Sequence, residues 1–107
     1  MTPHPVEDDA ALLRTAAARL TDLAARSTAG DWRIGGLLAS RPEVIAHRPD
    51  GGTEHVAEAR AASVRWITGL APAIAGPLTD WLLSAADRAE PDEPALRLAR
   101  LLLERLS

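Results

Sequence analysis

The sequence predicts an α+β fold that is mostly helical, with about four helices and one small antiparallel β-hairpin inserted after the first helix. Two observations predict this class. Leu and Ala recur at helical spacing over most of the chain, whereas strand-like alternation is confined to residues 31–48. A turn-forming segment, Thr28-Ala29-Gly30-Asp31-Trp32, separates the two patterns. The length of 107 residues predicts a single domain over 1–107, with a flexible N-terminal tail at 1–5.

The first helix is predicted over about residues 6–27. Three acidic residues at 7–9 stand where the helix dipole favours negative charge, and Gly30 supplies a stop. Residues three and four apart form its apolar stripe: Val6, Ala10, Leu13, Ala17, Leu20 and Ala24.

Segments 31–39 and 43–48 predict the two strands of the hairpin. Trp32 and Ile34 share one strand face, as do Val44 and Ala46. Gly35-Gly36 fits either a bulge or a tight turn, so the sequence leaves the register open. An isolated hairpin is only marginally stable in water, so we expect this one to pack on the helices through Trp32, Ile34 and Val44.

The C-terminal half is predicted to be helical. Thr53 is a plausible N-cap for a helix that reaches Leu70, and Pro72 ends that helix or begins the next one. A break or kink is expected near Gly76-Pro77, followed by a helix to about residue 88. An acidic, proline-containing linker then leads to a last helix over about 94–106.

Composition excludes several classes of function. With no cysteine, the chain has no disulfide, no thiolate nucleophile and no Cys-based zinc site. The net charge of −3 comes from interspersed Arg, Asp and Glu, so no nucleic-acid partner is expected. The N-terminus lacks a signal-peptide pattern, and no apolar run approaches the roughly 20 residues of a membrane span. We therefore expect a cytoplasmic protein that does not bind a membrane.

Five segments carry a family resemblance through their order: Thr28-Ala29-Gly30-Asp31-Trp32, the Ala-rich segment 57–67, Leu70-Ala71-Pro72-Ala73, Leu78-Thr79-Asp80-Trp81-Leu82 and 95–100. Together they resemble small proteins of actinobacteria and their phages, similar to the Ead-type phage early proteins. The resemblance covers about residues 10–103, with Ala29 where the family often has Pro. It implies an α+β fold and an origin in a phage or mobile element, and it transfers no catalytic residue.

No catalytic, cofactor-binding or metal-binding residue is predicted. His47 and His55 flank a turn that contains Asp50 and Glu54, so a mononuclear metal site is conceivable there, but a solvated loop is the simpler interpretation. Neither glycine pair belongs to a phosphate-binding loop, because the chain has no Lys to reach a phosphate. The serines do not lie in a nucleophile-elbow pattern.

The expected contacts with a protein partner are Trp66 beside the buried face of its helix, and Leu96 and Leu103 pointing outward from the last helix. Six leucines on that helix also favour a homodimer. The sequence therefore favours a non-enzymatic accessory protein that binds another protein or itself. One alternative is a small hydrolase or nucleotide-handling enzyme that uses the loop acids and histidines. The other is an antitoxin-like regulator, which would need Arg14, Arg19, Arg26 and Arg33 to form a one-sided cluster.

Overall fold

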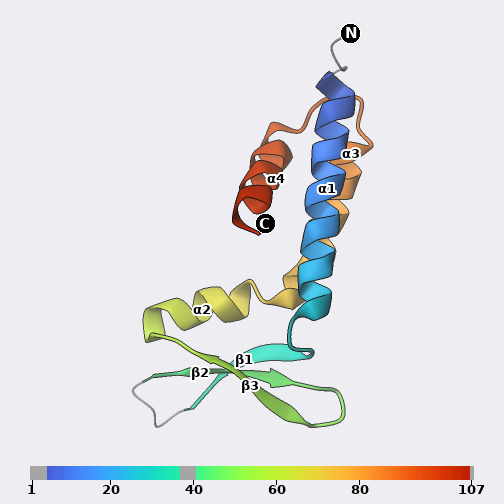
Figure 1. Ribbon diagram of the computed structural model, residues 1–107. Helices are drawn as coiled ribbons and strands as arrows, with labels where there is room; N and C mark the ends of the chain where they lie inside the picture. Colours follow the sequence, from blue (N-terminus) through green and yellow to red (C-terminus); the bar gives the residue numbers. More distant parts are fainter. Residues whose placement is uncertain (1–4, 37–40, 107) are drawn as a thin grey trace. The chain divides into compact units, whose positions relative to one another are not determined.

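The computed structural model describes residues 5–36 and 41–106 and confirms the α+β class (Figure 1). The tail expected at 1–5 lies outside the described residues except for Pro5, which begins the first helix. The elements in chain order are α1 (Pro5–Arg26), β1 (Asp31–Gly35), β2 (Glu43–His47), β3 (Thr53–Glu58), α2 (Ala61–Gly69), a 3-10 turn η1 (Pro72–Ile74), α3 (Ala75–Ala86) and α4 (Glu93–Arg105).

Contacts divide the chain into two compact units. The helical unit comprises residues 1–24 and 75–107, and the sheet unit comprises residues 25–74. The single domain expected over 1–107 stays a prediction. Among the described residues, no helix is both long and apolar enough to cross a bilayer.

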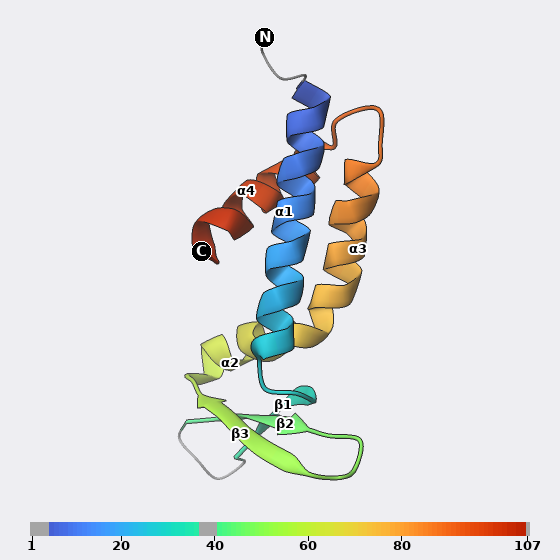
Figure 2. The same cartoon turned by 45° about the vertical axis from the view of Figure 1, so that its right-hand side comes forward.

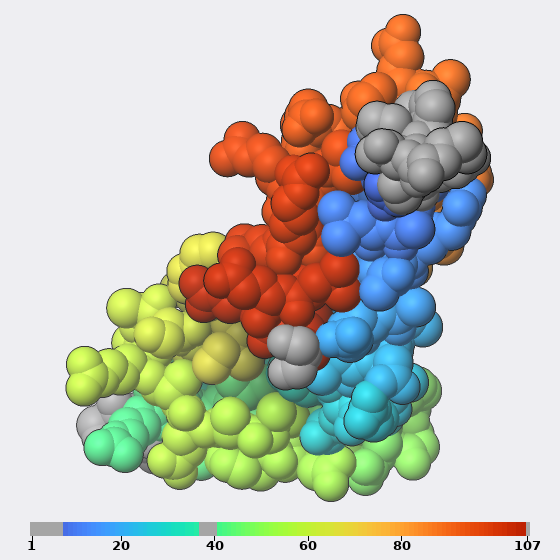
Figure 3. Space-filling view, turned by 45° about the horizontal axis from the view of Figure 1, so that its top comes forward, coloured from blue at the N-terminus to red at the C-terminus, as the bar shows by residue number. Residues whose placement is uncertain are grey.

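The helical unit consists of α1, α3 and α4. In Figures 1 and 2, α1 and α3 lie side by side and run in opposite directions. The space-filling view in Figure 3 shows the side chains of α4, in red, against those of α1, in blue. All three helices contribute to one buried cluster.

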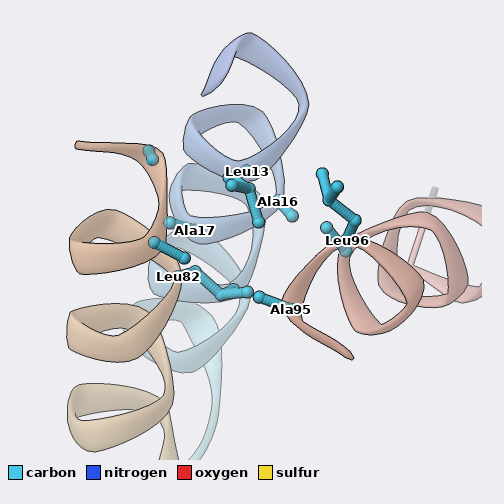
Figure 4. Close-up of a cluster of buried hydrophobic side chains, with 9 residues drawn as sticks. Leu13, Ala16, Ala17, Leu82, Ala95 and Leu96 are labelled. Atoms are coloured by element: carbon cyan, nitrogen blue, oxygen red, sulfur yellow. The ribbon is translucent and has the colours of Figure 1, made fainter. Parts of the chain in front are cut away.

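That cluster is built mainly from alanine (Figure 4). Its nine residues are Leu13, Ala16 and Ala17 from α1, Leu82, Ala85 and Ala86 from α3, and Ala95, Leu96 and Ala99 from α4. Small side chains let helix backbones approach closely, so the three leucines supply most of the core volume. This is the interior expected for a chain that contains no Phe or Tyr.

The boundaries of α3 and α4 follow from local chemistry. Pro77 is the third residue of α3, in the first turn, where the missing N–H has no intrahelical partner to lose. The break expected near Gly76-Pro77 is therefore the start of α3, directly after η1. Asp92 is the N-cap of α4, and its Oδ1 accepts a hydrogen bond of 3.2 Å from the Ala95 N–H.

Replacing this cap should measurably weaken the helical unit. Asp92→Ala removes the only side-chain acceptor described at the start of α4, and loss of such a cap typically costs about 1 kcal/mol of unfolding free energy. Urea denaturation followed by circular dichroism measures the loss. Glu90→Ala is the matched control, because Glu90 is an exposed acid of the same linker outside the helix. Equal effects of the two substitutions would contradict the capping role.

The sheet unit contains a three-stranded antiparallel sheet in the order β1-β2-β3, so the expected two-stranded hairpin is only part of it. In the β1–β2 register Trp32 lies opposite Ala46 and Ile34 opposite Val44, which confirms the predicted sharing of faces. The bulge lies between β2 and β3, at Val44/Ile45. Gly36 follows β1 with a φ of +71°, and the rest of the strand expected to residue 39 lies outside the described residues.

The helix predicted to begin at Thr53 is wrong, because Thr53–Glu58 is β3 and α2 begins only at Ala61. The preceding turn explains the difference. The Arg48 N–H donates to the Gly52 oxygen at 2.8 Å and the Gly51 N–H to the Arg48 oxygen at 3.0 Å, which closes a hairpin. Thr53 then pairs with His47 in the ladder and does not cap a helix.

Helix α2 contacts β1 and β2 and buries one face of the sheet, as expected for a sheet that needs a helix beside it. Val44 and Ala46 from β2 and Val64 from α2 are buried at this face. Ile34 contributes less than expected, because it is 44% exposed. Trp32 is half-buried, and its Nε1 donates to the Thr28 oxygen at 2.9 Å, which fixes the turn before β1.

Candidate functional site

The outward side of α2 is apolar, although it faces away from the sheet. Trp66 is 71% exposed, and Leu70, one helical turn further on, is 57% exposed. Ala62 and Gly69 are also exposed and lie on the same side by helical spacing. We call these four residues, Ala62, Trp66, Gly69 and Leu70, the α2 face.

Local sequence explains why both sides of this short helix are apolar. Val64 is buried and Ile67 is half-buried on the side of α2 that faces the sheet. Trp66 projects from the exposed side of the same helix. Leu70 is the C-cap residue, whose N–H donates to the Trp66 oxygen at 3.0 Å. This bond holds the Leu70 backbone one turn below Trp66. A surface helix usually carries polar residues on its outward side, and here only Ser63 and Arg65 are polar there.

The charged residues of α2 and its N-cap are arginines, and Glu58 lies just before them. Arg60, the N-cap residue, makes no side-chain cap hydrogen bond, and Arg65 lies on the exposed side next to Trp66. A shallow hollow before α2 is lined by Arg41, Glu58, Ala59 and Arg60. Neither α2 nor η1 contains an acidic residue.

The outward direction expected for Leu96 is wrong, because Leu96 is 1% exposed and belongs to the core cluster. Leu103 is half-buried and packs against the same cluster. The inward side of α4 is a stripe formed by Ala95, Leu96, Ala99 and Leu103. This stripe is missed when only the leucines of the helix are considered. Leu101, 49% exposed, is the leucine that points outward among the described residues of α4.

The homodimer expected through α4 stays a prediction. Leu96 and Leu103, the two leucines expected to serve it, lie against the core, and the outward side of α4 carries Arg97, Arg100 and Glu104 beside Leu101. Of the three predicted partner contacts Trp66, Leu96 and Leu103, only Trp66 is largely exposed, and Leu70, which the sequence did not single out, is exposed beside it.

The polar residues of the 48–54 turn have structural partners. Arg48 lies 3.9 Å from the Asp50 carboxylate and 3.7 Å from that of Glu54, and Asp50 also accepts the Gly52 N–H at 2.7 Å. His55 lies 3.7 Å from the Glu43 carboxylate. Over residues 5–36 and 41–106 no group of three or more His, Asp or Glu side chains could hold a metal ion.

Three of the four arginines named for a DNA-binding cluster are engaged within their own units. Arg14 pairs with Asp87 at 3.2 Å, Arg33 pairs with Asp31 at 2.8 Å, and Arg19 donates to the Leu106 oxygen at 3.5 Å. In each of these contacts the guanidinium group binds a carboxylate or a backbone oxygen of the protein itself. A one-sided surface of unpaired cations does not arise from these three residues.

One hollow of the helical unit lies beside α1, the end of α3 and the start of α4. It is lined by Asp9, Leu13, Arg88 and Asp92, among others. Asp92 caps α4, and Arg88 lies 3.7 Å from the Asp92 carboxylate. Two of the charged groups at this hollow, Arg88 and Asp92, are thus explained by helix capping and an ion pair.

Comparisons with protein-family models, curated proteins and solved structures gave no match. The resemblance to Ead-type early proteins, and the phage or mobile-element origin that it implies, therefore stay predictions.

Proposed function

We propose that this protein is a non-enzymatic accessory protein that binds another protein through the α2 face. The observation that carries the proposal is Trp66, a large aromatic side chain left 71% exposed with Leu70 beside it in a chain of only three tryptophans. Tryptophan is enriched among the residues that dominate binding energy at protein interfaces. Contiguous exposed apolar side chains are typical of sites that a partner covers.

The alternative functions have weaker support. An enzyme that uses the 48–54 turn would need polar groups converging on a pocket, whereas Arg48 already pairs with Asp50 and Glu54. An antitoxin-like regulator would need an unpaired Arg surface, and Arg14, Arg19 and Arg33 have partners of their own. The α2 face fits neither alternative.

Capture of a partner with matched variants tests the proposal. Tagged wild-type protein, Trp66→Ser and Leu70→Ser are used as bait in a nuclease-treated lysate of the cells that express the protein. Trp81→Ser and Leu101→Ser are the controls, because each removes an exposed side chain of the same type from the helical unit. Thermal melts establish that all variants are folded.

We expect one protein to be retained stoichiometrically by the wild type and both controls. Retention should fall about 30-fold for Trp66→Ser, since truncating a central anchor costs about 2 kcal/mol or more of binding free energy. Equal capture by Trp66→Ser and Trp81→Ser, or recovery of the bait alone, would contradict the proposal.

A further inference from the structure

We propose that the occupant of the α2 face is a short acidic amphipathic helix of the partner protein. This inference rests on the proposed function and specifies the chemistry of the partner. It is carried by the charges that surround the α2 face and by the limited area of that face.

The arginines near α2 differ from the other arginines of the sheet unit. Arg33 and Arg48 pair with acids of their own strands and turn. Arg41, Arg60 and Arg65 are exposed and make no ion pair with any of the described residues. Since the whole chain has a net charge of −3, a segment of two arginines and no acid from Arg60 to Ile74 is a local reversal of charge.

The charges and the apolar side chains are ordered along α2. Arg60 stands at its N-terminal end, where the helix dipole adds partial positive charge, and Leu70 stands at its C-terminal end. Trp66 and Arg65 lie between them. A complementary segment therefore has carboxylates opposite Arg60 and Arg65 and apolar residues, spaced by three or four, opposite Trp66 and Leu70.

The size of the α2 face sets the length of its occupant. Arg60 and Leu70 are ten positions apart, which corresponds to about 15 Å along a helix. A partner helix of roughly three turns spans this distance. Peptide helices of this kind bind apolar grooves and faces through residues at positions i, i+3, i+4 and i+7.

A second copy of this chain fits the α2 face poorly. A two-fold contact brings the same patch together with itself, so each Arg65 would approach another cation. An acidic partner removes this repulsion.

Selection from a displayed library of twelve-residue helical peptides tests the inference on the intact protein. The wild type should enrich peptides that combine Asp or Glu with Leu, Ile or Phe at i,i+4 spacing. Binding of the best peptide should weaken at least tenfold in Arg60→Glu/Arg65→Glu, and it should weaken as salt rises, because exposed charges are screened. Arg97→Glu/Arg100→Glu on α4 is the matched control and should bind like the wild type.

A charge swap sharpens the test. The same peptide with Lys in place of its acidic residues should bind Arg60→Glu/Arg65→Glu better than it binds the wild type. If the enriched peptides require Trp66 but show no acidic preference, the inference is overturned and the proposed function stands. If no enriched peptide depends on Trp66, both fail. If vesicles of phosphatidylcholine and phosphatidylserine bind in a Trp66-dependent manner and peptides do not, the occupant is a lipid surface, and both are again overturned.

Discussion

Leu96→Ala should lower the free energy of unfolding of the helical unit by about 2–5 kcal/mol. Leu96 is 1% exposed and is one of only three leucines in a nine-residue core, in which the other six residues are alanines. The six alanines have no side-chain atoms beyond Cβ with which to fill the space of a lost isobutyl group, so a cavity remains. Urea denaturation followed by helical circular dichroism measures the change.

Leu101→Ala on the same helix is the control for Leu96→Ala. Leu101 is 49% exposed, so its truncation removes little buried surface, and we expect a loss within about 0.5 kcal/mol. Comparable losses of unfolding free energy for the two substitutions would show that α4 does not place Leu96 in the core. Leu96→Glu, which buries a carboxylate in the same position, should prevent folding of the helical unit.

Gly30→Ala should have the second large effect, a loss of at least about 2 kcal/mol of unfolding free energy in the sheet unit. Gly30 has a φ of +115°, a conformation that residues with a Cβ rarely adopt. An added Cβ would also lie 2.8 Å from the backbone oxygen of His47 and 3.1 Å from its carbonyl carbon. His47 pairs with residues of β1 and β3, so moving its backbone away from the added Cβ would disrupt the sheet.

Gly51→Ala separates the two causes of this loss. Gly51 also has a positive φ, +88°, but no atom lies within 4 Å of an added Cβ. The Gly51 variant should therefore show the backbone strain alone, about 1 kcal/mol. Denaturation of both variants, followed by tryptophan fluorescence, makes the comparison. If Gly30→Ala lowers the free energy of unfolding no more than Gly51→Ala does, the close approach of the added Cβ to His47 does not affect stability.

The parts of the fold that depend on local pattern could be predicted. The first helix was expected over about 6–27 and runs over Pro5–Arg26, because its apolar stripe, acidic start and glycine stop are all local signals. Strand alternation also predicts that Trp32 and Ile34 share one face of β1, and that Val44 and Ala46 share one face of β2. These features need no knowledge of distant contacts.

β3 could not be predicted, because its state is decided by pairing. Thr53 has a side chain suited both to a helix N-cap and to a strand, and Glu54 fits a helix start as well as a solvated strand face. The ladder with β2 decides between them, and that ladder depends on the 48–52 turn. Segment length does not distinguish the two states here.

The candidate site was predicted in part. The exposure of Trp66 follows from its position beside Ile67 and Val64, which occupy the buried side of the same helix. Leu70 was missed because an aliphatic residue at a helix end resembles a core residue until the position of the C-cap is known. Leu96 and Leu103 were assigned outward because the inward role of Ala95 and Ala99 was not counted.

The alanine-rich interior has a genetic consequence. A single base change in an alanine codon yields Val, Thr, Ser, Pro, Asp, Glu or Gly. Ala16, Ala95 and Ala99 have no exposed surface, so every one of these replacements except Gly adds atoms where close packing leaves no room. Glycine in a helix interior costs about 1 kcal/mol. Almost every single substitution of these buried alanines is therefore expected to destabilise the protein. The composition of this interior can change only when one side chain becomes smaller as a facing one becomes larger.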